Sequence, residues 1–117
     1  MRDLCAVAVA AATGAGAEYA DARAVLRRSQ HVSTKNGRVE QLVDTESEGI
    51  GVRVLVNGAW GFACDRRLSA AGAREAALRA CAFAKAAGGR GPRALAPLEA
   101  HTGSFRTEVG RDPFSVS

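Results

Sequence analysis

The chain has 117 residues, enough for one domain with a hydrophobic core of its own. Its 16 basic and 12 acidic residues give a formal net charge of +4, but the acidic residues interrupt the arginines along the chain. The adjacent pairs Arg27-Arg28 and Arg66-Arg67 are too short to form a basic stripe, which argues against a nucleic-acid partner. No apolar stretch reaches the length that a membrane span requires.

The first predicted element is a helix over 3–13, whose apolar residues share one broad stripe. Asp3 is a good N-cap, and Gly14 and Gly16 follow as helix stops. Because Arg2 precedes an apolar run, the segment also resembles a short signal peptide. The N-cap, the helix stops and the low charge of the first residues favour a helix, and with it a cytoplasmic protein.

A strand is predicted over 18–35, because alanines alternate with other residues in its first half. The high alanine content leaves a helix over 17–28 as an alternative. From Arg27 to Thr34 both faces are polar except at Val32, so this part is expected to be the exposed end of a ribbon. The turn dipeptide Asn36-Gly37 then leads into a second strand over 38–46.

The most regular pattern of the chain lies at 48–65, in the sequence EGIGVRVLVNGAWGFACD. Large apolar residues alternate before and after an Asn57-Gly58 turn, as in a β-hairpin with one buried face. Gly49 and Gly51 mark the beginning of the third predicted strand, and Asp65 marks the end of the fourth.

The loop length of this hairpin decides which residues are buried. A two-residue loop pairs Val56 with Ala59 and leaves the valine face opposite alanine and glycine only. A three-residue loop pairs Leu55 with Ala59 and gathers nearly all the large apolar residues on one face. Because a one-residue shift exchanges the two faces of a strand, burial favours the three-residue loop. The predicted core of the hairpin is then Val52, Val54, Trp60 and Phe62.

The opposite face of the predicted hairpin carries Gly49, Gly51, Arg53 and Gly61. Such small residues let another chain approach the backbone closely. This face is therefore the candidate site for a peptide or for a subunit interface. A thinly covered sheet face without a ligand is the plainer alternative.

A second helix is predicted over 70–87, with Ser69 as its cap and Gly88-Gly89 as its stop. Its stripe of small residues, which includes Cys81, suits close packing on a sheet. From 88 onward glycine and proline recur without a period. The predicted fold is α+β, with a helix, a four-stranded antiparallel β-meander, a helix and an extended C-terminal tail. The expected division is a domain over 1–87 and a connector over 88–117.

No group of residues in the sequence predicts catalysis or metal binding. His31 and His101 are the only histidines, and neither has a second ligand at a suitable spacing. Cys5, Cys64 and Cys81 form no C-x-x-C pair, and Cys64 and Cys81 fall on predicted core faces. Buried free thiols in a reducing compartment are therefore expected. The chain alone is expected to bind no zinc and to cleave no peptide.

Four short segments follow one another along the chain. They are Gly-Ala-Glu-Tyr-Ala-Asp-Ala-Arg at 16–23, Lys-Asn-Gly-Arg-Val-Glu at 35–40, Gly-Ile-Gly-Val-Arg-Val at 49–54 and Gly-Ala-Trp-Gly-Phe-Ala at 58–63. Their order and spacing resemble the N-terminal domain of the TldD/PmbA family, also called the modulator of DNA gyrase family. The resemblance extends from Leu4 to Ala87, and Asp112-Pro113 resembles the lead-in to the next region of that family.

The resemblance implies a role but no catalytic residue in this chain. Members of the family are described as zinc metalloproteases that act on peptides and small proteins, often as a pair of related subunits. Their zinc is held in a C-terminal domain by a helical His-Glu motif and a cysteine, and this sequence has no such segment. The chain is therefore expected to be a non-catalytic N-terminal domain that helps to enclose peptide substrate and to form the subunit interface. Its expected partners are its own C-terminal domain and a homologous subunit.

A stand-alone peptide- or protein-binding scaffold without protease activity is the alternative. Sheet edges bind extended peptides through backbone hydrogen bonds in either case. Open strand edges also predict a homodimer of this chain at high concentration.

Overall fold

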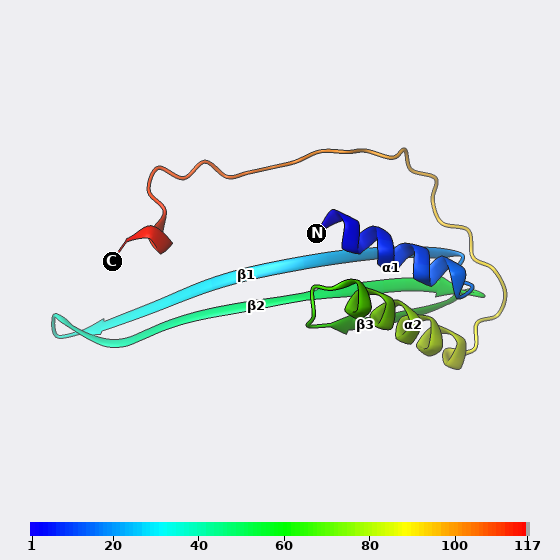
Figure 1. Cartoon of the computed structure of the whole chain (residues 1–117), viewed down its shortest axis with the longest axis horizontal. Coiled ribbons are helices and arrows are strands. Elements are labelled where there is room, and N and C mark those ends of the chain that lie inside the picture. The colour runs from blue at the N-terminus through cyan, green and yellow to red at the C-terminus, as the bar shows by residue number, and fades with distance from the viewer. Residues whose placement is uncertain (117) are drawn as a thin grey trace.

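The computed structural model describes residues 1–116 and shows a three-stranded antiparallel sheet with two helices on one face (Figure 1). The elements in chain order are α1 (Arg2–Gly14), β1 (Tyr19–Lys35), β2 (Arg38–Val56), β3 (Ala59–Asp65), α2 (Ala70–Ala87) and the short 3₁₀ helix η1 (Pro113–Ser115). The strand order is β1-β2-β3. The predicted α+β class and both predicted helices are confirmed, whereas the predicted four-stranded meander is wrong.

The second and third predicted strands are one continuous strand, β2. Glu48 pairs with Leu26 and Gly49 pairs with Val25, so the ladder with β1 runs through the position of the predicted break. Glycine weakens a strand, but it does not end one whose backbone groups are paired by a neighbour. The first half of β1, for which a helix was the alternative, is a strand as well.

Beyond the helices, β1 and β2 continue as a two-stranded ribbon, and the molecule is 62 Å long (Figure 1). Asn36 and Gly37 both have positive φ and close the tip of the ribbon. A bulge near the tip shifts the register between Ser33 and Thr34. The ribbon is exposed on both faces, as the polar sequence after Arg27 predicts.

The end of the tail returns to this ribbon. Residues 88–112 contain no helix or strand, and η1 follows them. The ring of Phe114 lies 4.7 Å from the guanidinium of Arg28, which also pairs with Asp44 at 2.9 Å. The tail thus runs along the side of the molecule and contacts the ribbon beside α1 (Figure 1).

The second hairpin has a two-residue loop, so the predicted three-residue loop is wrong. Val56 pairs with Ala59, and Leu55 pairs with Trp60. Asn57 has φ of 49° and Gly58 has φ of 80°, which is the left-handed pair that a type I′ turn requires.

This register reverses the predicted placement of the aromatic residues. Trp60 is 43% exposed and Phe62 is 60% exposed, so the prediction that both are buried is wrong. Val52 and Val54 are fully buried, as predicted. Opposite the valines stand Gly61 and Ala63.

Small residues face the valines because α2 lies almost against the backbone of β3. A β-carbon on Gly61 would lie 2.1 Å from the carbonyl oxygen of Ala80 and 2.7 Å from the nitrogen of Ala84. Only glycine fits in this position. Alanines of both helices complete the core against the sheet: Ala8, Ala12, Ala73, Ala76, Ala77, Ala80 and Ala84.

One large residue is buried on the opposite face of the sheet. Leu55 is 1% exposed and stands between Tyr19 and Trp60 in a row across the three strands. The two rings meet edge to face, with centroids 6.1 Å apart, and close over the leucine between them.

Gly61→Ala is expected to destabilise the protein by at least about 2 kcal/mol, because the new methyl group forces α2 away from β3. Urea denaturation followed by circular dichroism measures the loss. Gly14→Ala is the matched control, since nothing lies within 4 Å of a β-carbon placed there. Equal stability of the Gly61→Ala variant and the parent would contradict this packing.

Two truncations distinguish the two hairpin registers. Leu55→Ala should cost about 2–5 kcal/mol, because removal of a buried leucine leaves a cavity. Phe62→Ala should cost about 1 kcal/mol or less, because most of the ring already faces solvent. Chemical denaturation of both variants gives the comparison, and a larger loss at Phe62 than at Leu55 would support the three-residue loop.

Candidate functional site

The candidate site lies on the sheet face that points away from the helices, which we call the outer face. The strand register places Asp21, Arg53 and Phe62 in one row across this face. In the next row, Arg23 on β1 stands beside Gly51 on β2. Because glycine has no side chain, the centre of the face is an open hollow of 640 Å³.

Two glycines of β2 form the floor of the hollow. A β-carbon on Gly51 would lie 3.2 Å from the ring of Phe62, so the ring lies over this glycine. A β-carbon on Gly49 would lie 3.1 Å from the carbonyl oxygen of Asp65 and 3.6 Å from the Cα of Arg66. The floor is therefore backbone, and the exposed ring of Phe62 forms one wall.

Arg53 is held in place by its neighbours on the outer face. Its Nε and Nη2 donate hydrogen bonds to Oδ2 of Asp21, at 2.9 and 2.7 Å. Its guanidinium lies 5.1 Å from the centre of the Trp60 ring. The hydroxyl of Tyr19 donates to the same oxygen of Asp21 at 2.9 Å. The hydrogen bond to Asp21 raises the pKa of Arg53.

The structure brings together three of the residues that the sequence assigned to this face. Gly49, Gly51 and Arg53 all line the hollow. Gly61 does not join them, because the two-residue loop turns it toward α2. Whether the face binds a peptide or a subunit stays a prediction.

Sequence reasoning missed the arginines that surround the hollow. Arg23 and Arg27 of β1 line it, and so does Arg66, which follows the end of β3. The signal was present in the alternation of β1, because Arg23 and Arg27 share the parity of Asp21 and therefore its face.

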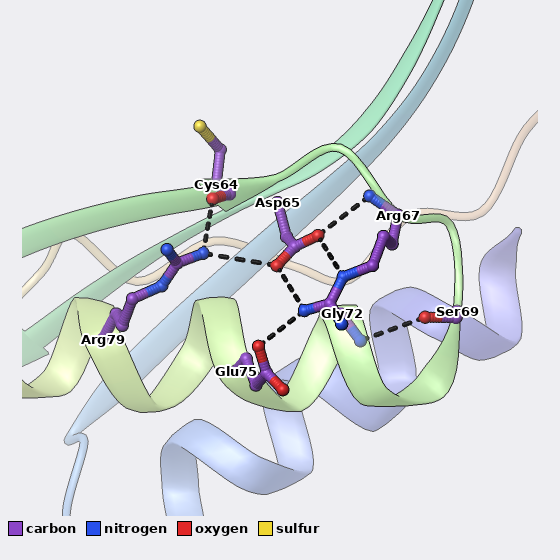
Figure 2. A network of polar contacts seen from close by, with 7 residues as sticks. All are labelled: Cys64, Asp65, Arg67, Ser69, Gly72, Glu75 and Arg79. Atoms are coloured by element: carbon purple, nitrogen blue, oxygen red, sulfur yellow. Dashed lines mark hydrogen bonds and ion pairs between the residues drawn. The ribbon is translucent and has the colours of Figure 1, made fainter.

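Beside the hollow, an ion-pair network joins the end of β3 to α2 (Figure 2). Arg67 donates from Nε and Nη2 to the two carboxylate oxygens of Asp65, at 2.9 and 2.8 Å, and also pairs with Glu75. Arg79 donates to the carbonyl oxygen of Cys64 at 2.7 Å. The Asp65 side chain is 10% exposed, and its hydrogen bonds from Arg67 hold its pKa well below the ordinary range.

This network was also missed, although its parts are visible in the sequence. Asp65 ends the hairpin pattern, and Arg67 follows two residues later. Glu75 and Arg79 are four residues apart on a predicted helix, which places them on one face. Because each of its acids already has an arginine partner, the network fixes α2 against β3 and offers no free base or nucleophile.

The histidines and cysteines do not converge. In the part of the chain that the structure describes, no group of three or more histidine, cysteine, aspartate or glutamate side chains is placed to hold a metal ion. His31 lies on the ribbon and His101 in the tail. Cys64 is exposed, so its predicted burial is wrong. Cys81 is buried as predicted, its thiol donates to the carbonyl oxygen of Ala12, and burial raises its pKa.

Neither helix of residues 1–116 combines the length and the apolar character needed to cross a membrane. The outer face presents arginines and an aromatic wall around the hollow. The fold and this face together describe a small α+β domain with an arginine-lined hollow on its sheet.

Comparison with known proteins gives the family. Residues 20–84, which contain most of the sheet and most of α2, match the family model described as PmbA/TldA metallopeptidase domain 1. The match covers more than half of the chain, and the chain belongs to this family. The resemblance stated from the sequence is thereby confirmed.

A relative from Methanothermobacter thermautotrophicus carries the name metalloprotease. It is 40% identical to this chain over 63 residues. The aligned segment makes up 54% of this chain and 13% of that protein. This chain therefore corresponds to a small part of the relative's length.

Asp65→Asn is expected to lower the free energy of unfolding at neutral pH. The folded-state pKa of Asp65 lies below the unfolded value of 3.8, so its carboxylate stabilises the fold fully above that value and loses this effect as the pH falls below it. Urea denaturation at about pH 7, 5 and 3 should show the difference between parent and variant shrinking toward the lowest pH.

Glu99→Gln, an exposed carboxylate of the tail, is the control and should leave stability unchanged at each pH. A constant difference between the parent and the Asp65→Asn variant across this range would show that Asp65 stabilises the fold other than by its charge.

Proposed function

We propose that this chain serves as a non-catalytic N-terminal domain of a larger PmbA/TldD-type zinc peptidase. In this role it helps to enclose the peptide substrate and contributes to the subunit interface. The observation that carries the proposal is the family match over the sheet and α2. In this proposal, the C-terminal domain of the larger peptidase binds the zinc. The proposed compartment is the cytoplasm.

The ribbon supports a role in assembly. It exposes apolar side chains along its length, and Val32 and Leu42, paired across the strands, are 52% and 64% exposed. A two-stranded hairpin without a covering layer is only marginally stable in water. Packing against another surface stabilises it, because its exposed apolar side chains are then buried. The ribbon is thus suited to reach over a second domain or a second subunit.

The edge of β3 supports a role in peptide binding. β3 is an outer strand of the sheet, and Trp60, Phe62 and Cys64 are exposed along it. An extended peptide can pair with such an edge through backbone hydrogen bonds. Its side chains would then alternate between the outer face and the side of α2.

A chimera tests the proposed function. The 63 residues of this chain that align with the M. thermautotrophicus metalloprotease replace their counterparts in that protein. Cleavage of a fluorogenic peptide and zinc content are then measured. Because the domain positions the peptide rather than cleaving it, activity should stay within about tenfold of the parent enzyme, which is about 1.4 kcal/mol in barrier height. Zinc content should be unchanged, and the 117-residue chain alone should show neither zinc nor activity.

The same chimera carrying Gly61→Ala is the control for a correctly packed domain and should lose stability and activity together. A folded, zinc-loaded chimera without activity would contradict the proposed function. That result, together with peptide binding by the chain alone, would indicate the alternative of a stand-alone binding scaffold.

A further inference from the structure

The charged residues around the hollow are sorted by the two faces of the sheet. Successive side chains of a strand alternate, so the register assigns each residue to the helix side or to the outer face. The carboxylates of β2 between 44 and 48 share the parity of the buried Val52 and lie on the helix side. Glu48, at the rim of the hollow, is one of them. Among the described residues, the outer face beside the hollow carries one carboxylate, Asp21, which already binds Arg53.

Three arginines around the hollow keep their charge available for a ligand. Arg23 and Arg27 lie on the outer face of β1, Arg66 follows the end of β3, and all three line the hollow. None of the three takes part in an ion pair within the part of the chain that the structure describes. The nearby carboxylate of Asp65 belongs to the network that joins β3 to α2. The hollow therefore has a net positive charge.

The register places these three arginines around one point. Gly49 pairs with Val25, which lies midway between Arg23 and Arg27 on β1. A β-carbon on Gly49 would lie 3.6 Å from the Cα of Arg66, so Arg66 and Val25 are on opposite sides of β2. Residues two strands apart are separated by about 10 Å, and residues four positions apart on one strand by about 13 Å. The long arginine side chains thus begin at the corners of a triangle with glycine backbone at its centre, and they can reach one ligand together.

The positive charge ends where the hollow ends, which favours a small ligand. Beyond Arg27, the outer face of the ribbon presents serine, threonine, histidine and valine side chains: Ser29, His31, Ser33, Val43, Thr45 and Ser47. None of these is an arginine or a lysine, so a nucleic-acid strand would find no stripe of basic partners along the ribbon. The hollow of 640 Å³ falls within the range of about 300–1,000 Å³ that is typical of small-molecule pockets.

Phe62 gives the hollow an aromatic surface as well. Its ring leans over Gly51, with two ring atoms 3.2 Å from the position of a β-carbon there, and the residue is 60% exposed. The ring of Trp60, by contrast, already contacts Tyr19 and Arg53. Phe62 is therefore the ring beside the hollow that is left to stack on a planar group of a ligand.

An aromatic ring beside several guanidinium groups suits a nucleoside phosphate. Guanidinium groups bind phosphate through paired, charge-assisted hydrogen bonds. A nucleobase stacks on an aromatic side chain whatever its sequence identity, because every base has a π-face. A simple polycarboxylate or an inorganic phosphate would contact the arginines and leave the ring without a partner.

We propose that the hollow of the outer face binds a nucleoside di- or triphosphate, with its phosphates on Arg23, Arg27 and Arg66 and its base on Phe62. The nucleotide is bound as a ligand, without a chemical step. The hollow is separate from the free edge of β3, and the inference does not depend on the peptide-binding role proposed for the domain.

Calorimetric titration of the 117-residue chain with adenosine diphosphate, in the absence of magnesium, tests the site. Binding should be saturable and should weaken strongly when the salt is raised from about 50 to about 500 mM, because exposed charges are screened. Adenosine and inorganic pyrophosphate should each bind about fivefold more weakly or worse, since each keeps only the stacking or only the charge contacts.

Matched variants separate the charges from the ring. Arg23→Gln/Arg66→Gln should weaken the affinity for adenosine diphosphate by about tenfold or more, whereas Arg90→Gln/Arg106→Gln in the tail should change it by less than about twofold. Phe62→Ala should weaken it by about fivefold or more without affecting pyrophosphate. Phe105→Ala, a ring of the tail that is 92% exposed, is the control for Phe62→Ala. Circular dichroism confirms that the variants are folded like the parent.

Cys64 provides a second readout at the hollow itself. Its thiol is exposed, pairs in register with Gly51 and lines the hollow, whereas Cys81 is buried. Saturating adenosine diphosphate should slow the alkylation of Cys64 by iodoacetamide by about threefold or more, because the ligand covers the thiol. Alkylation of Cys5, which lies on α1 on the other side of the sheet, should not change. Peptide mass spectrometry distinguishes the three thiols.

Two competing ligands complete the test. A triglutamate peptide and an oligothymidylate of about eight nucleotides should both bind more weakly than adenosine diphosphate. Tighter binding of the oligothymidylate would indicate a nucleic-acid surface, and equal binding of triglutamate or pyrophosphate would indicate a general anion patch. Either result overturns the proposal. So do the absence of saturable binding, equal losses in the two arginine double variants, an unchanged affinity of Phe62→Ala, and binding that leaves Cys64 unprotected.

Discussion

The close approach of α2 to β3 at Gly61 is the constraint on which the rest of the structure depends. The carbonyl oxygen of Ala80 and the nitrogen of Ala84 lie where a β-carbon of residue 61 would be. Backbone proximity of this kind requires alanine on the helix and glycine or alanine on the strand, and the chain supplies both along the whole contact. The core between the sheet and the helices is therefore thin and made of small residues, with Ile50, Val52 and Val54 as its largest buried members.

The same constraint produces the outer face. Because small residues must face α2, the large residues of β3 can only point the other way, and Trp60 and Phe62 are left exposed. Tyr19 and Trp60 cover Leu55, and Arg53 is held between Trp60 and Asp21. The surface on which the candidate site lies is thus a consequence of how tightly the other face is packed.

The helices, the turns and the exposed ribbon could be predicted from the sequence, whereas the number of strands and the register of the second hairpin were predicted wrongly. The Ser69 cap, the two Asn-Gly turns and the exposed ribbon are local properties, and these were predicted from residue types. The predicted N-cap Asp3 is wrong, because α1 begins one residue earlier, with Met1 at the cap and Asp3 inside the first turn. The hairpin register differs from the prediction because side-chain size does not measure burial here: a helix close to the backbone buries the small residues. The Asn57-Gly58 dipeptide, which favours a two-residue type I′ turn, was the better signal. At the site, Gly49, Gly51 and Arg53 lie together on the outer face, as predicted. Gly61 faces α2 instead, and the prediction did not include the arginines of β1.

The charge of the site also depends on pairing rather than on composition. A net charge of +4 spread over 117 residues gives no reason to expect a basic surface. In the folded chain, Arg53 neutralises Asp21, and Arg67 and Arg79 engage Asp65, so the acids nearest the hollow are already satisfied by other arginines. Arg23, Arg27 and Arg66 then face the hollow with a single free carboxylate, Glu48, beside them. The network that fixes α2 against β3 therefore also leaves the outer face positively charged, which connects the packing of the core to the charge of the surface.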